Sequence, residues 1–355
     1  MNNGMFKSAL PTYQRGLSII ELMVAMLLGL VIMGAVAGVM LSNTQSFRTA
    51  RAVSQIQDSV RVGYELLARD IRQAGNMPCG NDVPVVNILN DAQEADTPWQ
   101  YDWGDGILGL DADDVLSGVN NRVEGTEALI LTSGDDGDVY IEDYADDNNS
   151  ANFTVGFSGE SHGLRDGDIL MVCNEKLATI FQMSSGQGNN AGKIVVNTGK
   201  KNEPGNCTKG LGEIKPGNNS NQPCDINGVR GPYERNTIVA KLSSVAWYIG
   251  DNGRAGEGGR SLYMVRLGTA SNGNAELNQI EVASGVTDMQ LRYRLKDTSN
   301  FIAAGSVTNW ADVNAVEVSL KLDSQDRNVS VDRSENNGRL SREFTSIVAI
   351  RNRSL

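Results

Sequence analysis

The chain has 355 residues, of which 40% are hydrophobic and 21% charged, a composition of folded proteins that excludes global disorder. Its 43 acidic residues exceed its 31 lysines and arginines, and the formal net charge of -12 argues against a general nucleic-acid-binding protein, which needs clustered cations. His162 is the single histidine of the chain, so a metal site with several histidines cannot form, and few Ser-His-Asp triads are possible.

The first predicted element is a membrane-spanning helix. Residues 1–16 contain two cations and no acid, and residues 22–41 carry no charge. These twenty residues make about 30 Å of helix, the thickness of the hydrocarbon core of a bilayer. Glu21 opens the run. Since a carboxylate in hydrocarbon costs roughly 2 to 4 kcal/mol, Glu21 needs either a partner or a position at the interface.

A secretory signal peptide is the alternative for this segment. Ala35, Val36 and Ala37 precede Gly38, which is a small-residue cleavage pattern after an apolar core. The apolar run continues to Leu41 and begins with an acid, and both features disfavour cleavage there.

The helical pattern continues beyond the apolar run. Apolar residues recur every three or four positions up to Ala74, and Gly75 and Pro78 predict the end of the helix. A helix from Leu17 to Ala74 is too long for an element of a free domain. We therefore expect its first half in lipid or against other subunits, and its second half across a sheet.

Acidity is concentrated in residues 82–147, which contain eighteen acidic residues and one basic residue, Arg122, while the rest of the chain has a net charge of +5. Two runs place several carboxylates within one turn, as calcium loops do, but neither has the spacing of an EF-hand. Solvated acidic loops are the alternative interpretation. The weak calcium candidates are Asp111, Asp113, Asp114, Asp135, Asp136 and Asp138. No other metal and no cofactor is expected.

The segment GDGILG, from Gly104 to Gly109, matches the GxGxxG fingerprint of dinucleotide-binding proteins. It follows a tryptophan-rich segment instead of an apolar strand, and the acids after it would repel a pyrophosphate. We interpret it as a glycine-rich loop and His162 as a surface residue. Because no P-loop, GxSxG or HExxH motif occurs either, the sequence predicts no enzyme.

Beyond Cys79 the chain has the pattern of β-strands and loops. Residues 251–260 predict a hairpin tip, and residues 197–235 a long connection that separates two subdomains or forms an exposed excursion. The predicted strands are Ala128–Thr132, Ile169–Cys173, Ala178–Met183, Lys193–Val196, Val245–Ile249, Leu262–Leu267, Met289–Leu295, Val316–Leu322 and Phe344–Ile350.

Four cysteines without a CxxC motif predict disulfide bonds, not a zinc site, and therefore an oxidising compartment. Three pairings are possible, and sequence alone does not select one. A bond between Cys207 and Cys224 would stabilise the fold by about 3 kcal/mol through chain entropy. A bond between Cys79 and Cys173 would join the end of the helix to a strand. We favour this pairing.

Residues 15–22, RGLSIIEL, resemble the processing site of type IV pilins and pseudopilins, in which a basic leader ends in glycine and glutamate is fifth in the mature chain. The resemblance implies that a prepilin peptidase cleaves after Gly16 and that Leu17, where most members have phenylalanine, is N-methylated. It also gives Glu21 a partner, the terminal ammonium of a neighbouring subunit, which would offset the desolvation of the carboxylate.

Further stretches resemble minor pilins of the PilW type. They are ELLARDIRQAG (residues 65–75), VC with IFQ (172–173 and 180–182), and FTS with AIRNR (344–346 and 349–353). Residues 82–160 and 197–235 show no such likeness.

The resemblance implies an α+β pilin-like fold, in which a long N-terminal helix packs on an antiparallel β-rich head with two β subdomains. The expected division is a leader (1–16), a transmembrane or filament-core helix (17–42), its amphipathic second half (43–78), an acidic β-rich head with long loops (79–235) and a C-terminal antiparallel β subdomain (236–355).

Such a protein is expected to join a priming or tip complex that initiates type IV pilus assembly and supports twitching motility, adhesion or DNA uptake. The implied partners are other minor pilins, the major pilin, the prepilin peptidase, the inner-membrane assembly platform and a large tip adhesin, without direct nucleic-acid binding. The expected location is the inner membrane, with a single pass and a periplasmic head, and then the pilus at the cell surface, at its tip or base. A minor pseudopilin of a type II secretion system and a membrane-anchored periplasmic enzyme are the alternatives.

Overall fold

The computed structural model describes residues 16, 18–80, 83–93, 97–135, 138–147, 150–157, 162–185, 192–199, 202–219, 222–330 and 336–353. The chain divides into two compact units, residues 1–51 and residues 52–355, which we describe separately. The predicted leader up to residue 15, the methylation site Leu17 and the calcium candidate Asp136 lie outside the described residues.

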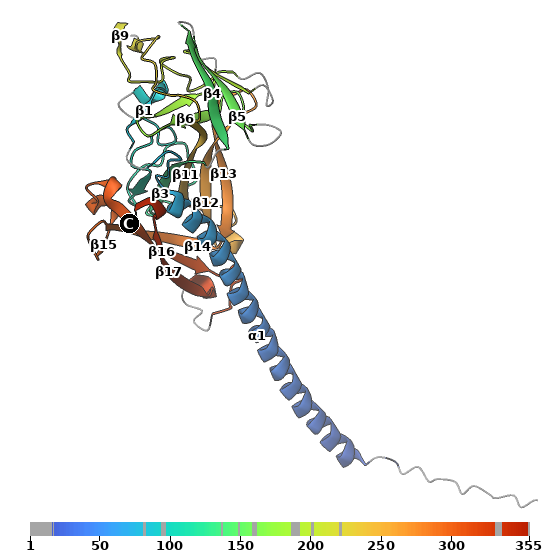
Figure 1. Ribbon diagram of the computed structural model, residues 1–355. Helices are drawn as coiled ribbons and strands as arrows, with labels where there is room; N and C mark the ends of the chain where they lie inside the picture. The colour runs from blue at the N-terminus through green and yellow to red at the C-terminus, as the bar shows by residue number, and fades with distance from the viewer. Residues whose placement is uncertain are drawn as a thin grey trace, which may run out of the picture. The chain divides into compact units, whose positions relative to one another are not determined.

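One long helix, α1 (Ile19–Gln73), confirms the predicted N-terminal element (Figure 1). Ser18 precedes it and caps its first turn, because the Ser18 hydroxyl accepts a hydrogen bond from the amide of Ile20 at 3.3 Å. Glu21 lies in the first turn and Arg72 in the last, as the helix dipole favours. The helix ends where Gly75 adopts a positive φ of 67°.

The β-rich unit contains an eleven-stranded sheet, a four-stranded sheet and a two-stranded ribbon. Their strands are β1 (Val85–Asn87), β2 (Ile107–Leu110), β3 (Ala128–Gly134), β4 (Val139–Asp147), β5 (Ser150–Phe157), β6 (Ile169–Cys173), β7 (Ala178–Gln182), β8 (Lys193–Val196), β9 (Pro216–Asn219), β10 (Gln222–Cys224), β11 (Ile238–Asp251), β12 (Arg260–Thr269), β13 (Ala275–Ser284), β14 (Val286–Leu295), β15 (Phe301–Ile302), β16 (Val313–Asp323) and β17 (Ser341–Ala349). Short 3₁₀ helices are η1 (Asp91–Gln93), η2 (Ala255–Glu257), η3 (Ala304–Ser306), η4 (Trp310–Asp312), η5 (Asn336–Gly338) and η6 (Arg351–Arg353).

The long strand β11 lies in the middle of the eleven-stranded sheet and belongs to both of its parts (Figure 1). Its first residues pair with β6 and β4, and its later residues pair with β3 on one side and β12 on the other. Strands from before and after residue 235 therefore share one sheet. The predicted boundary at residue 235 does not coincide with a boundary between sheets. With the exception of the parallel pair β1 and β7, the pairs between the described strands are antiparallel.

The four-stranded sheet has the order β15-β14-β16-β17 and shares a core with α1, β11 and β12. Leu67 and Ile71 of α1 are completely buried in this core beside Trp247, Leu262 and Val318. Two other clusters, around Phe153 and Phe181 and around Met171 and Ile180, fill the region of β4 to β8. The head is thus held together by its own apolar contacts.

Two disulfide bonds link the head, Cys79–Cys173 and Cys207–Cys224, with Cα separations of 5.8 and 5.6 Å. This is the pairing that we favoured from the sequence. The first bond joins the segment after α1 to the end of β6, and the second closes the loop that contains β9 and β10.

Within the described residues of the connection (197–199, 202–219 and 222–235), the chain packs into the head and is not an exposed excursion. Leu211 and Tyr233 belong to the core around Phe153, and Asn206 is 1% exposed. The side-chain amide of Asn206 donates to the carbonyl of Gln182, and its oxygen accepts from the Gln182 amide. A polar side chain therefore continues the pairing of β7, and the buried loop satisfies its hydrogen bonds.

Candidate functional site

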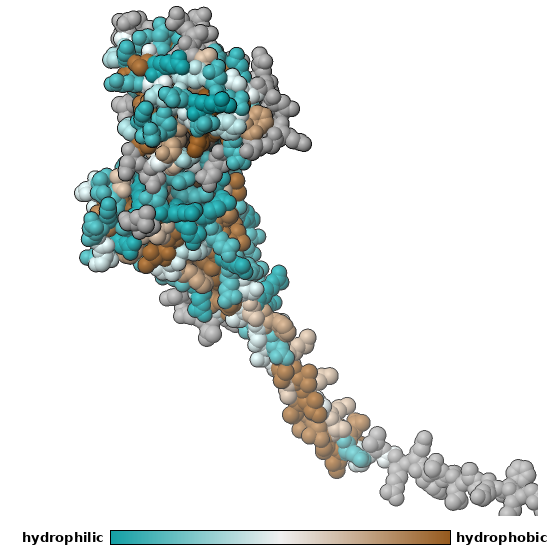
Figure 2. All heavy atoms as spheres, in the orientation of Figure 1, coloured by the Kyte–Doolittle hydropathy of each residue, from teal (hydrophilic) through white to brown (hydrophobic). Residues whose placement is uncertain are grey.

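The N-terminal part of α1 presents apolar side chains without a partner in the chain. By length and composition α1 can cross a membrane, and no residue of its most apolar stretch is buried. Figure 2 shows this stretch as a run of hydrophobic atoms. The large exposed side chains are Ile19, Ile20, Leu22, Met23, Val24, Met26, Leu27, Leu28, Leu30, Val31, Ile32, Met33, Val36, Val39, Met40 and Leu41. Lipid or other helices must cover this surface.

Glu21 is the charged residue at the start of this surface. It lies in the first turn of α1, five positions after Gly16, and is exposed. The next charged side chain along the helix is Arg48, because residues 22–47 contain none. A carboxylate at this position is stable in an apolar environment when a cation from another chain approaches it.

Where α1 crosses the sheet, Asp70 forms a buried polar contact. Its carboxylate is 7% exposed and accepts a hydrogen bond from the indole nitrogen of Trp247 on β11 at 3.1 Å. Arg69 and Arg266 each approach it at 3.5 Å. Desolvation raises the pKa of the Asp70 carboxyl, and the two arginines partly oppose this effect. Asp70 therefore holds the helix on the sheet.

Asp70 lies in the segment of residues 65–75 that resembles PilW-type minor pilins, and this resemblance implies no role for it. One signal was available, because Asp70 lies one turn from the apolar residues Leu67 and Ala74 on the face that turns toward the sheet. A carboxylate on such a face is buried and requires a partner.

The end of α1 is fixed by the C-terminal segment. The side-chain amide of Asn352 donates to the carbonyl of Gly75 at 2.8 Å. Arg353 donates to the carbonyls of Trp310 at 2.7 Å, of Val313 at 3.2 Å and of Asp105. Burial lowers the pKa of the Arg353 guanidinium, while Asp105 opposes this shift. These contacts connect four distant segments of the chain around the helix terminus.

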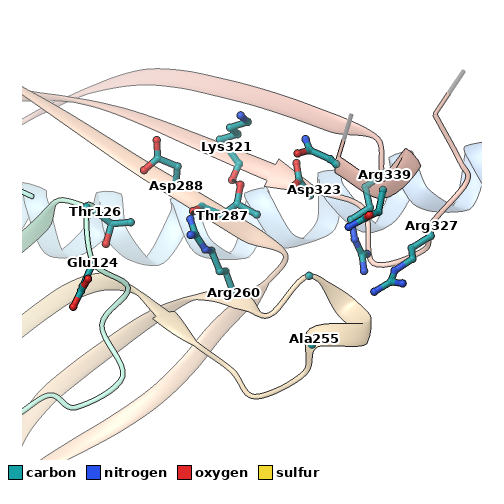
Figure 3. Close-up of a pocket in the computed structure, with 14 residues that line it drawn as sticks. Glu124, Thr126, Ala255, Arg260, Thr287, Asp288, Lys321, Asp323, Arg327 and Arg339 are labelled. Atoms are coloured by element: carbon teal, nitrogen blue, oxygen red, sulfur yellow. Dashed lines mark hydrogen bonds between the residues drawn. The ribbon is translucent and has the colours of Figure 1, made fainter. Parts of the chain in front are cut away.

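A polar cleft of about 650 Å³ lies beside the turn between β11 and β12 (Figure 3). Arg260, Lys321, Arg327 and Arg339 line it together with Glu124, Asp288 and Asp323. Its described lining residues include no histidine, cysteine or serine. The cleft is suited to recognising charged groups of both signs.

The role of Arg339 in this cleft is structural. Its guanidinium is 6% exposed and donates to the carbonyls of Ser324 and Gly256, each at 2.6 Å. These bonds join the loop after β16 to the turn between β11 and β12. The cleft therefore has a fixed wall.

The calcium candidates do not form a ligand cluster in the described part of the chain, where no group of three His, Cys, Asp or Glu side chains could hold a metal ion. Instead, the Asp111 carboxylate accepts from the amide of Gly305 at 2.9 Å, and that of Asp114 from the amide of Asp111 at 2.8 Å. Arg122 donates to the carbonyls of both aspartates. These carboxylates stabilise turns. Asp113, Asp135 and Asp138 belong to no such group either.

The prediction of a surface position for His162 is wrong. His162 is 7% exposed, its Nδ1 accepts from the amide of Leu164 at 3.0 Å, and its ring packs edge-on against Phe157. The residue has a packing role that its polar neighbours in the sequence conceal.

Two family models match the chain. Residues 11–37 match the prokaryotic N-terminal methylation motif, and residues 246–352 match the type IV pilus-assembly protein W family. No curated protein and no solved structure matches the chain significantly. The two matches cover the start of α1, the last residues of β11, the strands from β12 to β17 and the first two residues of η6.

Proposed function

We propose, from the premise that this chain is a membrane-anchored minor pilin of the PilW type, that it joins a priming or tip complex that initiates assembly of a type IV pilus. In this proposal the head lies in the periplasm and later on the pilus at the cell surface, at its tip or base. The complex supports twitching motility, adhesion or DNA uptake. The protein acts as a structural subunit and has no catalytic role.

One observation carries the proposal. A methylation motif stands at the start of a helix whose apolar side chains from Ile19 to Leu41 are exposed, while the helix is anchored at its other end in a head of the assembly-protein type. A surface of this kind is stable in lipid before assembly and between other helices after it. The same helix thus supports both states of a pilus subunit.

Glu21 is the residue that we assign to subunit recruitment. After a prepilin peptidase has cut between Gly16 and Leu17, a free ammonium group stands at the start of each mature chain. The Glu21 carboxylate of one subunit binds the ammonium of its neighbour in the apolar filament core, and this charge pair fixes the axial position of the incoming subunit. Other minor pilins, the major pilin, the assembly platform and a large tip adhesin are the partners in this proposal.

The test compares Glu21→Gln with the wild-type chain in its native cell. We expect that Glu21→Gln keeps the protein in the membrane but abolishes its copurification with other minor pilins in mild detergent. Glu65→Gln is the matched control, since Glu65 lies on the same helix and is 64% exposed beside Arg61. Equal copurification of both variants would contradict the role of Glu21.

Mass spectrometry of the mature protein tests the processing step. The expected terminus is N-methylated Leu17, whereas signal-peptide cleavage would place Gly38 first. Deletion of the gene tests the assembly role. Loss of pili supports the proposal, and normal pili with a defect in protein secretion would favour a type II secretion pseudopilin.

A further inference from the structure

The GDGILG segment is a loop only in its first half, residues 104–106, because its last three residues belong to β2. This loop borders a cavity of about 220 Å³ on the head. Three of the four tryptophans of the chain line this cavity, Trp99, Trp103 and Trp310. Asp102 and Asp105, both exposed, stand at the same cavity. Among its described lining residues there is no lysine, arginine or histidine. We call this site the tryptophan cavity.

Its walls come from distant segments and are held in place. Trp99 donates from its indole nitrogen to the carbonyl of Ser117 at 3.0 Å. The ring of Trp310 meets Tyr293 edge to face, with 4.8 Å between the ring centroids. Both indoles therefore keep their orientation when the cavity is empty, which lowers the cost of binding.

The glycines of the loop allow a close approach to the end of α1. Gly106 has a φ of 74°, and a Cβ atom at this position would lie 2.3 Å from the Cα of Gly75. Arg353 contacts the loop through the carbonyl of Asp105 and also donates to the carbonyls of Trp310 and Val313. The Asp102 carboxylate accepts from the amide of Gly104 at 2.9 Å. The loop is thus preorganised by the helix terminus and the C-terminal segment.

We infer that the tryptophan cavity binds a positively charged organic group, of which trimethylammonium is the simplest form. Indole faces attract cations through their quadrupole, and tryptophan does so best among aromatic residues. Two carboxylates at the same cavity add electrostatic attraction, and the segment of residues 82–147 to which they belong has a net charge of -17. The volume is below the range of about 300 to 1,000 Å³ for drug-sized ligands and fits a single head group.

Two sources can provide this chemistry, a small solute and a lysine or arginine side chain of a protein partner. A neutral sugar is the competing ligand class, because sugars also stack on indole rings. Sugars require hydroxyl recognition and gain little from the Asp102 and Asp105 carboxylates at this cavity. The charge of the site therefore favours a cation.

The experiment uses the full-length protein in a poly(ethylene glycol) ether detergent, which has neither a choline nor a sugar head group. The probes are choline, its neutral isostere 3,3-dimethylbutan-1-ol, glucose, and the acetylated amides of lysine and arginine. The indole N–H signals of the isotope-labelled protein report binding by NMR. Trp247 is an internal reference, because it is completely buried and bonded to Asp70.

We expect choline to shift the signals of Trp103 and Trp310 without moving that of Trp247, and to bind about tenfold more tightly than its isostere. The double variant Asp102→Asn/Asp105→Asn should reduce the affinity for choline to that for the isostere. Its matched control is Asp113→Asn/Asp138→Asn, which removes the same charge from exposed positions of the same acidic segment outside the cavity. Tighter binding of an amino-acid amide than of choline would identify a protein partner as the source.

Equal affinities for choline and its isostere, a preference for glucose, or unmoved indole signals would each overturn the inference. So would unchanged choline binding by the Asp102→Asn/Asp105→Asn variant. If this variant does not fold, the comparison of choline with its isostere on the wild-type protein decides alone. None of these outcomes depends on the proposed role in pilus assembly.

Discussion

The helix α1 spans both compact units, residues 1–51 and residues 52–355, and its apolar side chains have different environments in the two. In the first unit the large side chains from Ile19 to Leu41 are exposed on all sides of the helix. In the second, one face of the helix is buried, with Leu67 and Ile71 at 0% exposure, while Arg61 and Glu65 on another face form an exposed ion pair. The apolar side chains of α1 in the first unit can be covered only by lipid or by other chains, whereas those in the second unit are covered by residues of the same chain.

Because of this difference, substitutions in the two units should be detected by different assays. A change in the first unit should alter membrane retention or subunit recruitment and leave the unfolding of the head unchanged. A change in the second unit should alter the free energy of unfolding of the head.

The largest effect is expected from the disulfide bonds. Cys79→Ser/Cys173→Ser opens a bond across 94 residues and should lower the free energy of unfolding of the head by about 4.7 kcal/mol in the chain-entropy model. Cys207→Ser/Cys224→Ser, across 17 residues, should cost about 3.1 kcal/mol. Denaturant unfolding of the full-length protein in detergent measures both, and membrane retention should not change. A larger loss from the shorter loop would contradict the model.

The second effect concerns carboxylates on one helix. Asp70→Ala removes the buried partner of Trp247 and Arg266 and should cost about 3 kcal/mol of unfolding free energy, at the low end for a broken buried pair because both arginines are partly exposed. Glu65→Ala, in an exposed ion pair, should cost about 0.5 kcal/mol or less.

Glu21→Ala completes this series, because it lies in the first unit. It should leave the unfolding of the head unchanged and reduce recruitment alone. The separation of the two units fails if Glu21→Ala destabilises the head as much as Asp70→Ala does.

The third effect compares two helical glycines. A Cβ atom on Gly63 would lie 3.0 Å from Leu262 and 3.4 Å from Ala283, whereas nothing lies within 4 Å of one on Gly34. Gly63→Leu should cost about 2 kcal/mol through overpacking, offset by about 0.8 kcal/mol of helix propensity, and so reduce stability by about 1 kcal/mol. Gly34→Leu should leave the unfolding midpoint of the head unchanged. If Gly34→Leu lowered that midpoint, the stability of the head would depend on the first unit as well, and the two units would not be independent.

The sequence predicts those parts of the fold whose pattern lies within one segment of the chain. The apolar residues that recur every three or four positions up to Ala74 predicted α1 to within two residues at its start and one at its end. The short apolar runs at β6 and β8 predicted those strands within their observed bounds. Both signals are local, because each element has its pattern within one segment of the chain.

Strands β4 and β5 were missed for a physical reason. In β4 the buried residues Val139, Ile141 and Tyr144 stand among aspartates and a glutamate, and a β-bulge between Ile141 and Asp143 interrupts their alternation. The strand forms because β5 and β11 pair with it, and this pairing is not visible in its own sequence.

The functional residues divide in the same manner. The role that we propose for Glu21 could be inferred from sequence, because the residue lies in a contiguous motif. The helical pattern could have indicated that Asp70 is buried, but the partners of Asp70 and Arg353 could not be identified, because they lie up to 248 positions away, such as Trp247 for the first and Asp105 for the second. The tryptophan cavity likewise needs Trp310 beside Trp99.

The smallest predicted effect is a pH dependence that originates at Asp70. Because burial raises the pKa of this carboxyl above its ordinary value of 3.8, the folded head binds the proton more readily than the unfolded chain does. Between the two pKa values, the unfolding free energy therefore increases as the pH falls, and this contribution is lost as the pH rises through the folded-state value. Asp70→Asn lacks this titration.

The measurement is the difference in unfolding free energy between the wild-type head and Asp70→Asn, followed from neutral pH down to about pH 4. Subtracting the variant cancels other carboxyls such as Glu127, whose pKa is also raised by burial. The wild-type protein should gain stability relative to the variant on acidification. A relative loss would mean that Arg69 and Arg266, together with the hydrogen bond from Trp247, outweigh desolvation at this contact, and that the ionised form of Asp70 is the one that the fold stabilises.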